Sequence, residues 1–278
     1  MAGILCLVPT PIGNLGDISI RCKKALEDAD FIAAEDTRVT LKLLNHLEIK
    51  KPLISYYEHN KQVSGPKIVE RILAGETCVL VSDAGSPAIS DPGEDLVRLC
   101  TEAGVTVTAV PGPCAAITAL SISGLPTGRF CFEGFLSVNK KSRQEHLSSL
   151  LHETRTMIFY EAPHKLQSTL QDMAAAFGED RRISLCRELT KLHEQVVRMT
   201  LGEAVSFYEA NPPRGEFVLI VDGAKEEARQ ELTIEDAVQL VARQIESGVS
   251  KKDAVKAVAK ETGLAKNTLY DAVLKQLG

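Results

Sequence analysis

Apolar and polar positions alternate in blocks over the first 125 residues. Short apolar runs predict five β-strands, at 4–8, 31–34, 52–56, 78–82 and 105–110. Between them, apolar residues recur at helical spacing and predict helices at 20–28, 39–47, 66–74, 94–103 and 114–122. Ser19, Thr37 and Ser64 are expected to cap three of these helices, and Gly75 and Gly104 to end two. Five strand–helix units in a row indicate an α/β domain, 1–125, with a mostly parallel five-stranded sheet and helices on both faces.

The pattern becomes less regular after a break at 125–128, Leu-Pro-Thr-Gly. Strands are expected at 129–136, 156–161 and 182–188, and helices at 144–151 and 164–177. A hairpin of strands 195–200 and 216–221 is expected to enclose a helix at 201–210. We therefore predict a second α/β domain, 126–224, with a mixed sheet. The basic segment 138–143 is interpreted as a polar loop near the domain junction.

The last segment, 225–278, predicts a small helical domain of the helix-turn-helix type. A charged linker at 225–231 precedes helices at 233–247, 250–260 and 266–277, and Ser250 is expected to cap the second helix. Apolar positions have the spacing of a helix-turn-helix, at Val255, Val258, Leu264, Leu269 and Val273. Ala265 departs from the motif, because a serine at this N-cap would add about 1 kcal/mol of stability. A three-helix bundle used for packing or dimerisation is the alternative interpretation.

The distribution of charge favours contact between this segment and nucleic acid. The whole chain has a formal net charge of −5 and does not resemble a nucleic-acid-binding protein. From residue 250 onward, however, it carries six lysines and only three acidic residues. We expect a local basic surface that binds the phosphates of a nucleic acid, with a second contribution from the domain junction. The candidate residues for this contact are Lys140, Arg143, Lys251, Lys252, Lys266 and Asn267.

Composition excludes several classes of protein. The chain is 44% hydrophobic and 25% charged, as is usual for a globular protein with a sizeable core. Its seven cysteines are scattered and form no C-x-x-C pair, which argues against a disulfide framework or a zinc ribbon and for a reducing compartment. No signal peptide and no apolar run of about 18 residues is present, so we expect a cytoplasmic protein without contact to a membrane.

Three loops carry the candidate chemistry, because they follow the first, fourth and fifth strands at one edge of the predicted sheet. They are 9–14, 82–93 and 110–116, and all are rich in glycine, proline, alanine and serine. Such residues let a flat ligand lie against the main chain, although ordinary turns between strand and helix are often rich in glycine too. The loops contain neither a P-loop nor a G-x-G-x-x-G fingerprint, and no cations that would bind a pyrophosphate. S-adenosylmethionine, with an adenosine and a positive centre but no phosphate, suits them better than a nucleotide.

Several motifs together carry a resemblance to a known family. LVPTPIGNLGDIS, SDAGSPAISDPG and VPGPCAAITALSISGLP closely resemble the tetrapyrrole-methylase-like superfamily of S-adenosylmethionine-dependent methyltransferases. Within it, FYEAPHKL, CRELTKLHE and PPRGEFVLIV are similar to the ribosomal RNA small-subunit methyltransferase I group, so that the resemblance spans nearly the whole chain. It implies methylation of the 2′-hydroxyl of a cytidine ribose in 16S ribosomal RNA. It also implies S-adenosylmethionine bound in a cleft between the two α/β domains, and a homodimer.

The resemblance assigns cofactor contacts to the three loops and leaves the catalytic residues to chemical reasoning. The expected cofactor-binding residues are Pro9, Gly13, Asp83, Gly85, Ser86, Pro87, Ile89, Cys114 and Ala115. A ribose hydroxyl is a weak nucleophile, so a base or a cation that lowers its pKa would help the transfer. The wider set of candidates is Glu161, Lys165, Arg187, Glu188, Lys191, His193 and Glu194, and we favour Arg187, Glu188 and Lys191. A surface ion pair is the alternative role for each of them.

Two further features resemble a metal site and a catalytic nucleophile, but we expect neither role. His193-Glu194 begins like a zinc-protease motif, but Val197 stands where the second histidine belongs, so no metal site is predicted. Cys114 is expected to be a small packing residue rather than a nucleophile, because methylation of an oxygen needs no cysteine.

Two other functions remain open at this point. A methyltransferase acting on a tetrapyrrole or corrinoid would explain the loops but not the basic tail. A DNA-binding regulator with a ligand-sensing body would explain the tail, but a single recognition helix requires a dimer to read its site.

Overall fold

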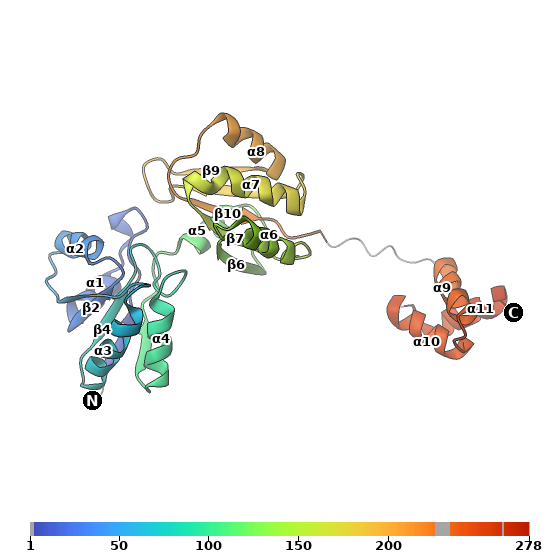
Figure 1. Cartoon of the computed structure of the whole chain (residues 1–278), viewed down its shortest axis with the longest axis horizontal. Helices are drawn as coiled ribbons and strands as arrows, with labels where there is room; N and C mark the ends of the chain where they lie inside the picture. The colour runs from blue at the N-terminus through green and yellow to red at the C-terminus, as the bar shows by residue number, and fades with distance from the viewer. Residues whose placement is uncertain (1–2, 226–233, 263, 278) are drawn as a thin grey trace. The chain divides into compact units, whose positions relative to one another are not determined.

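The computed structural model describes residues 3–225, 234–262 and 264–277 (Figure 1). The chain divides into two compact units, Met1–Ala224 and Lys225–Gly278. The first unit contains two five-stranded sheets and is therefore a pair of α/β domains, as the sequence predicts. Among the described residues, no helix is both long and apolar enough to cross a membrane.

The first sheet is parallel throughout, with strand order β3-β2-β4-β1-β5. Its strands are β1 (Ile4–Leu7), β2 (Phe31–Ala34), β3 (Leu53–Ser55), β4 (Cys78–Val81) and β5 (Thr106–Ala109). All five lie where the apolar runs place them. β2 and β4 are buried on both faces, as central strands of a parallel sheet are.

Helices cover both faces of this sheet. The apolar sides of α1 (Ile20–Asp28) and α2 (Thr37–His46) pack in one cluster, and those of α3 (Lys61–Leu73) and α4 (Gly93–Glu102) in another on the opposite face. A 3-10 turn, η1 (Leu15–Asp17), precedes α1, whose predicted cap Ser19 accepts the N–H of Cys22.

Two other predicted helix starts are wrong. Asp36 rather than Thr37 caps α2, because its carboxylate accepts the N–H of Arg38. α3 begins at Lys61, after Asn60, so that Ser64 and Pro66 lie inside the helix. Here the side chain of Asn60 accepts the N–H of Tyr57 and donates to the carbonyl of Ser55, which fixes the turn before the helix.

The second sheet is mixed, with strand order β6-β7-β10-β8-β9. Its strands are β6 (Phe130–Phe135), β7 (Thr156–Glu161), β8 (Arg182–Arg187), β9 (Gln195–Thr200) and β10 (Phe217–Val221). The predicted hairpin of 195–200 with 216–221 is wrong, because β9 pairs with β8 and β10 lies between β7 and β8. All five residues of β10 are buried, which suits a central strand, whereas β9 is partly exposed at the edge.

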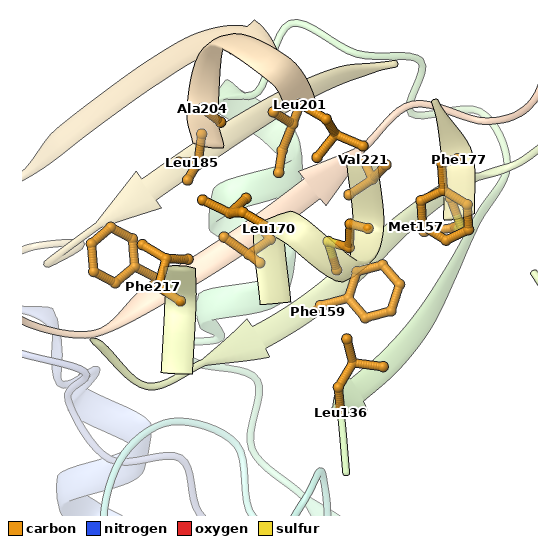
Figure 2. Close-up of a cluster of buried hydrophobic side chains, with 14 of the residues drawn as sticks. Leu136, Met157, Phe159, Leu170, Phe177, Leu185, Leu201, Ala204, Phe217 and Val221 are labelled. Atoms are coloured by element: carbon orange, nitrogen blue, oxygen red, sulfur yellow. The ribbon is translucent and has the colours of Figure 1, made fainter. Parts of the chain in front are cut away.

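One face of the second sheet packs against α6 (Lys140–Ser149), α7 (Pro163–Phe177) and α8 (Leu201–Ala210) in the largest apolar cluster, drawn in Figure 2. The other face is covered by α5 (Ala115–Ile122), which contributes Ala116, Ala119 and Leu120 to a separate cluster with β7, β8 and β10. α5, the helix that follows the last strand of the first sheet, therefore packs on the second sheet.

The segment 138–143 is not a loop as predicted, because most of it forms the start of α6. The side chain of Asn139 accepts the N–H of Ser142 and so caps this helix. Lys140 is exposed in its first turn. The guanidinium of Arg143 is instead bound 2.6 Å from the carboxylate of Asp172 in α7, and its side chain is only 12% exposed.

The second unit is the predicted group of three helices, α9 (Ile234–Glu246), α10 (Lys251–Thr262) and α11 (Lys266–Leu277). The hydroxyl of Ser250 accepts the N–H of Asp253, as expected of a cap. The apolar residues with helix-turn-helix spacing are buried or pack against a shared core. Of the predicted charged linker, residues 226–231 lie outside the described part of the chain, as does Gly263, which lies between α10 and α11 in the sequence.

Candidate active site between the two sheets

The three loops singled out in the sequence meet at one edge of the first sheet. They follow β1, β4 and β5, which are neighbours in the strand order, and parallel strands end at the same edge. Thr10 and Gly85 exchange two backbone hydrogen bonds of 3.0 Å, joining the first loop to the second. The hydroxyl of Ser86 donates to the carbonyl of Pro113 at 3.0 Å, joining the second loop to the third. The loops therefore form one continuous wall.

Glycine makes this wall possible where two backbones approach closely. A Cβ on Gly112 would lie 2.9 Å from the Cβ of Pro9, so only glycine lets the first and third loops pack together. Gly85 has φ of +83°, a conformation that other residues adopt at a cost. Close packing of the first loop on its two neighbours therefore requires glycine at these two positions of the other loops.

The wall faces a cavity of about 520 Å³ whose other side is built by the second sheet. This volume is typical of small-molecule sites. Of the expected cofactor-binding residues, Asp83, Gly85, Ser86, Ile89, Cys114 and Ala115 line it. Pro9, Gly13 and Pro87 are not among the lining residues, and the packing of Pro9 on Gly112 shows a role in loop shape.

Two carboxylates at the cavity are held in surroundings that disfavour their charge. Asp83 accepts the N–H of Asp36 at 3.0 Å, so it braces the loop after β2 in addition to its own loop. Burial raises the pKa of Asp83. Burial, together with the negative charge of Asp83, also raises the pKa of Glu35. Both residues therefore bind protons more readily than ordinary surface carboxylates.

The three favoured catalytic residues lie in or beside one network at the end of β8. The carboxylate of Glu188 accepts the N–H of Glu216 at 3.0 Å and the ammonium of Lys191 at 2.9 Å. Lys191 also pairs with the carboxylate of Glu216 at 2.8 Å. Arg187 donates to the carbonyl of Arg214, which lies in the loop before β10 that also contains Glu216. These contacts bring the three residues together but place none of them among the cavity-lining residues.

The same network contacts the first domain through Gly13. A Cβ on Gly13 would lie 2.5 Å from Cγ of Lys191 and 2.9 Å from the hydroxyl of Thr190. Glu188 and Thr190 have φ of +51° and +66°, so the segment that meets Gly13 is strained. Strain of this kind is typical of functional sites. Gly13 is therefore the point at which the first loop rests on the end of β8.

The remaining candidates have separate places. Glu161 lines the cavity but is buried, and its carboxylate accepts the hydroxyl of Thr169 at 2.6 Å and the N–H of Ala162 at 2.8 Å. Glu194 accepts the N–H of Thr190 at 2.6 Å, which stabilises the strained segment. Lys165 is half-buried in the first turn of α7, and His193 is exposed.

The sequence reasoning missed several residues that line the cavity: Glu35, Phe135, Tyr160 and Glu216. Glu35 directly follows β2, and only the strand order reveals that β2 is adjacent to β4. Tyr160 lies beside the candidate Glu161 at the end of a predicted strand, within the motif FYEAPHKL, and this position is the signal in the sequence that points to it. Its hydroxyl accepts the N–H of Ala116 at 3.2 Å, and burial raises its pKa to about 12.

Comparisons with known proteins match both units of the chain. Residues 5–205 match the family model described as Tetrapyrrole (Corrin/Porphyrin) Methylases, and residues 235–277 match one described as RsmI C-terminal HTH domain. The protein named Ribosomal RNA small subunit methyltransferase I from Synechocystis is 46% identical over 273 residues, 98% of each chain. The protein of the same name from Bacillus subtilis is 45% identical over 277 residues, 97% of this chain and 94% of its own.

Solved structures share the fold at low identity. Diphthine synthase aligns with a TM-score of 0.61 and 13% identity, over 80% of this chain and 90% of its own. Uroporphyrin-III C-methyl transferase from Thermus thermophilus, complexed with S-adenyl homocysteine, aligns with a TM-score of 0.54 and 18% identity, over 78% of this chain and 97% of its own.

We predict that Asp83→Asn stabilises the protein at pH 7 and that the gain shrinks as the pH falls toward 4. In the folded protein the pKa of Asp83 lies above 3.8, its ordinary value. At a pH between 3.8 and this raised pKa, the folded state therefore binds more protons than the unfolded state. The free energy of unfolding therefore decreases as pH rises through this window, and asparagine removes that loss while keeping an acceptor for Asp36. Thermal unfolding from pH 4 to pH 8 would measure the difference.

Asp36→Asn is the matched control with the opposite sign. Hydrogen bonds from Arg38 lower the pKa of Asp36 to about 2, so its charge stabilises the fold above the ordinary pKa and this stabilisation is lost as pH falls toward 2. The variant should be less stable than the parent at pH 7. Equal shifts for both variants at every pH would contradict the assignment.

Proposed function

We propose that this chain, which belongs to the tetrapyrrole methylase family, transfers a methyl group from S-adenosylmethionine to the 16S RNA of the small ribosomal subunit. The observation that carries the proposal is the extent of the similarity: relatives named for this activity are 45–46% identical over 97–98% of the chain, tail included. We further propose the 2′-hydroxyl of a cytidine ribose as the acceptor, on the motif resemblance described above.

The features of the cavity itself suit S-adenosylmethionine. It has the volume of a small-molecule site and a wall of bare loops, and its carboxylates Glu35 and Asp83 complement a positive centre. Asp83, Gly85, Ser86, Ile89, Cys114 and Ala115 are proposed to hold the cofactor, and Pro9, Gly13 and Pro87 to shape the loops around it. When bound, the cofactor supplies a methyl group activated by the positive charge on its sulfur.

The protein's own residues would then act on the ribose. The transfer neutralises charge rather than creating it, so holding the ribose oxygen in line at about 3 Å is the main contribution. The hydroxyl must also lose a proton, which passes to solvent. Lys191 is proposed to lower its pKa, Glu188 to hold Lys191 in place, and Arg187 to fix the neighbouring loop through the carbonyl of Arg214.

The second unit is proposed to bind RNA. Lys252, Lys266 and Asn267 are exposed, and Lys251 is half-buried. On the first unit, Lys140 is exposed and joins this proposal, whereas Arg143 is already paired with Asp172. A tetrapyrrole or corrinoid substrate is not favoured, because full-length relatives named for rRNA methylation share the tail.

We also propose that the protein forms a homodimer and that it is located in the cytoplasm. A homodimer would cover the exposed residues of edge strand β5, where Thr106, Thr108 and Ala109 face solvent, and sedimentation velocity would measure it. The cytoplasm, where ribosomal subunits assemble, is the proposed location, and cell fractionation would test it.

Methyl transfer to small ribosomal subunits from a strain lacking this gene is the direct test. With radiolabelled S-adenosylmethionine, we expect the label in a 2′-O-methylated cytidine after digestion of the RNA to nucleosides. Subunits from the parent strain, already modified, are the control and should accept little label. Protein shown to bind the cofactor but transferring label to neither subunits nor free rRNA would contradict the proposal.

Lys191→Met tests the proposed role of the ammonium. Methionine keeps an apolar stem against Gly13 but removes the charge, so kcat should fall by about 10²-fold with little change in the Kd of the cofactor. Lys61→Met is the matched control and should retain activity, because Lys61 in α3 is also half-buried and pairs with the carboxylates of Asp95 and Glu58 away from the cavity. A kcat within threefold of the parent would leave Lys191 with a packing role only.

Lys252→Ala and Lys266→Ala test the tail. Each lysine that contacts a phosphate releases counterions, so each variant should reduce the slope of log K against log salt for RNA binding by about 0.7–0.9. Lys67→Ala, an exposed lysine of α3, is the control. Unchanged slopes for both tail variants would favour the packing role of the helical unit.

A further inference from the structure

Strand β6 contains a bulge that changes the direction of Phe135. In a regular strand successive side chains point to opposite faces of the sheet. Cys131 packs on the cluster beneath α6, α7 and α8, and Phe132 on the opposite cluster beneath α5. By alternation residue 135 would share the face of Cys131, yet it is Leu136 that is buried in that cluster (Figure 2). The pairing of β6 with β7 shifts register between Phe132 and Gly134, which accounts for the change.

The bulge depends on a glycine and is in contact with the loop after β4. Gly134 has φ of +64°, which glycine adopts at low cost. A Cβ at this position would lie 3.3 Å from the hydroxyl of Ser90, so the second loop packs closely on the bulge. Bulges beside active sites commonly redirect a side chain. Here the redirected side chain is Phe135, which lines the cavity.

Phe135 is the most exposed phenylalanine or tyrosine in the described part of the chain, and its ring is supported by a neighbour. Its side chain lines the cavity while the residue is 56% exposed, which places it at the mouth. The ring centroid lies 5.5 Å from that of Tyr160, and Phe132 packs edge-on to Tyr160 at 5.1 Å. Tyr160 is itself fixed by its hydrogen bond to Ala116. An exposed phenylalanine held by Tyr160, which Phe132 supports in turn, is an apolar surface prepared for a flat ligand.

We infer that Phe135 is the stacking platform for the target base of the RNA substrate, an inference that rests on the proposed function. A ribose hydroxyl reaches a reaction site in a cleft only if its nucleotide leaves the stack, and unstacked bases are typically received on aromatic side chains. The position at the mouth fits a base that arrives from solvent as part of a large polymer. Ile89, 48% exposed and also lining the cavity, comes from the opposite domain and completes an apolar entrance.

Phe135→Ala is the first variant to measure, beside Phe135→Trp and the matched control Phe130→Ala. Phe130 is in the same strand and 39% exposed but does not line the cavity. Loss of one stacked base costs about 1–3 kcal/mol, so Phe135→Ala should raise the KM and the Kd for RNA roughly 5- to 150-fold. The Kd for S-adenosylmethionine should stay within twofold, Phe135→Trp should restore RNA binding, and Phe130→Ala should resemble the parent.

Each outcome separates this inference from the proposed function. If the parent protein methylates RNA and Phe135→Ala leaves both KM and Kd for RNA unchanged, the platform is wrong. If the variant weakens the cofactor and not the RNA, the ring serves the cofactor instead, and the inference fails. If the parent transfers no methyl group, the proposed function fails, while the difference in RNA Kd between Phe135→Ala and Phe130→Ala still decides whether this ring binds RNA.

Discussion

Close approach of backbone at glycine is the constraint on which the cleft depends. The loops and strands that form the cleft contact one another at glycines. At each of these glycines a Cβ would lie within 3.3 Å of the opposite segment, and several of them also have positive φ. A larger residue at the tightest of these points would push two segments apart, because the atoms opposite belong to Pro9 at Gly112, to Lys191 at Gly13 and to Glu188 at Gly215. These junctions, between loops, between domains and at the β6 bulge, are Gly85, Gly112, Gly13, Gly215 and Gly134.

The two domains contribute different chemistry to the cavity. The first supplies loops with few side-chain functions, together with carboxylates such as Glu35 and Asp83 whose raised pKa values reflect burial. The second supplies aromatic rings, and the ion-pair network around Lys191 at the end of β8 reaches the cavity through Glu216. The contribution of the first domain follows from topology, since a parallel sheet exposes its loops at one edge.

The favoured catalytic residues illustrate how far sequence reasoning reaches. Arg187, Glu188 and Lys191 lie at or just beyond the end of a predicted strand, and the structure places them together. It also shows contacts that no local pattern encodes: Glu188 accepts a backbone N–H from a loop 28 residues away, and the stem of Lys191 packs on Gly13 of the other domain. Phe135 was missed because its direction depends on a bulge, and period-two alternation assigns it to the wrong face.

The sequence by itself determined the strands and helices of the first domain, the mixed second sheet and the three tail helices, because hydrophobic periodicity and capping are local properties. It also placed the three bare loops at one edge, since parallel strands leave no other arrangement. Only the tertiary structure decided the strand order. β10 lies at the centre of its sheet, where all five of its residues are buried. β2 lies next to β4, which brings Glu35 beside Asp83. Pairing between distant segments depends on which faces can be buried together, and that is a property of the whole fold.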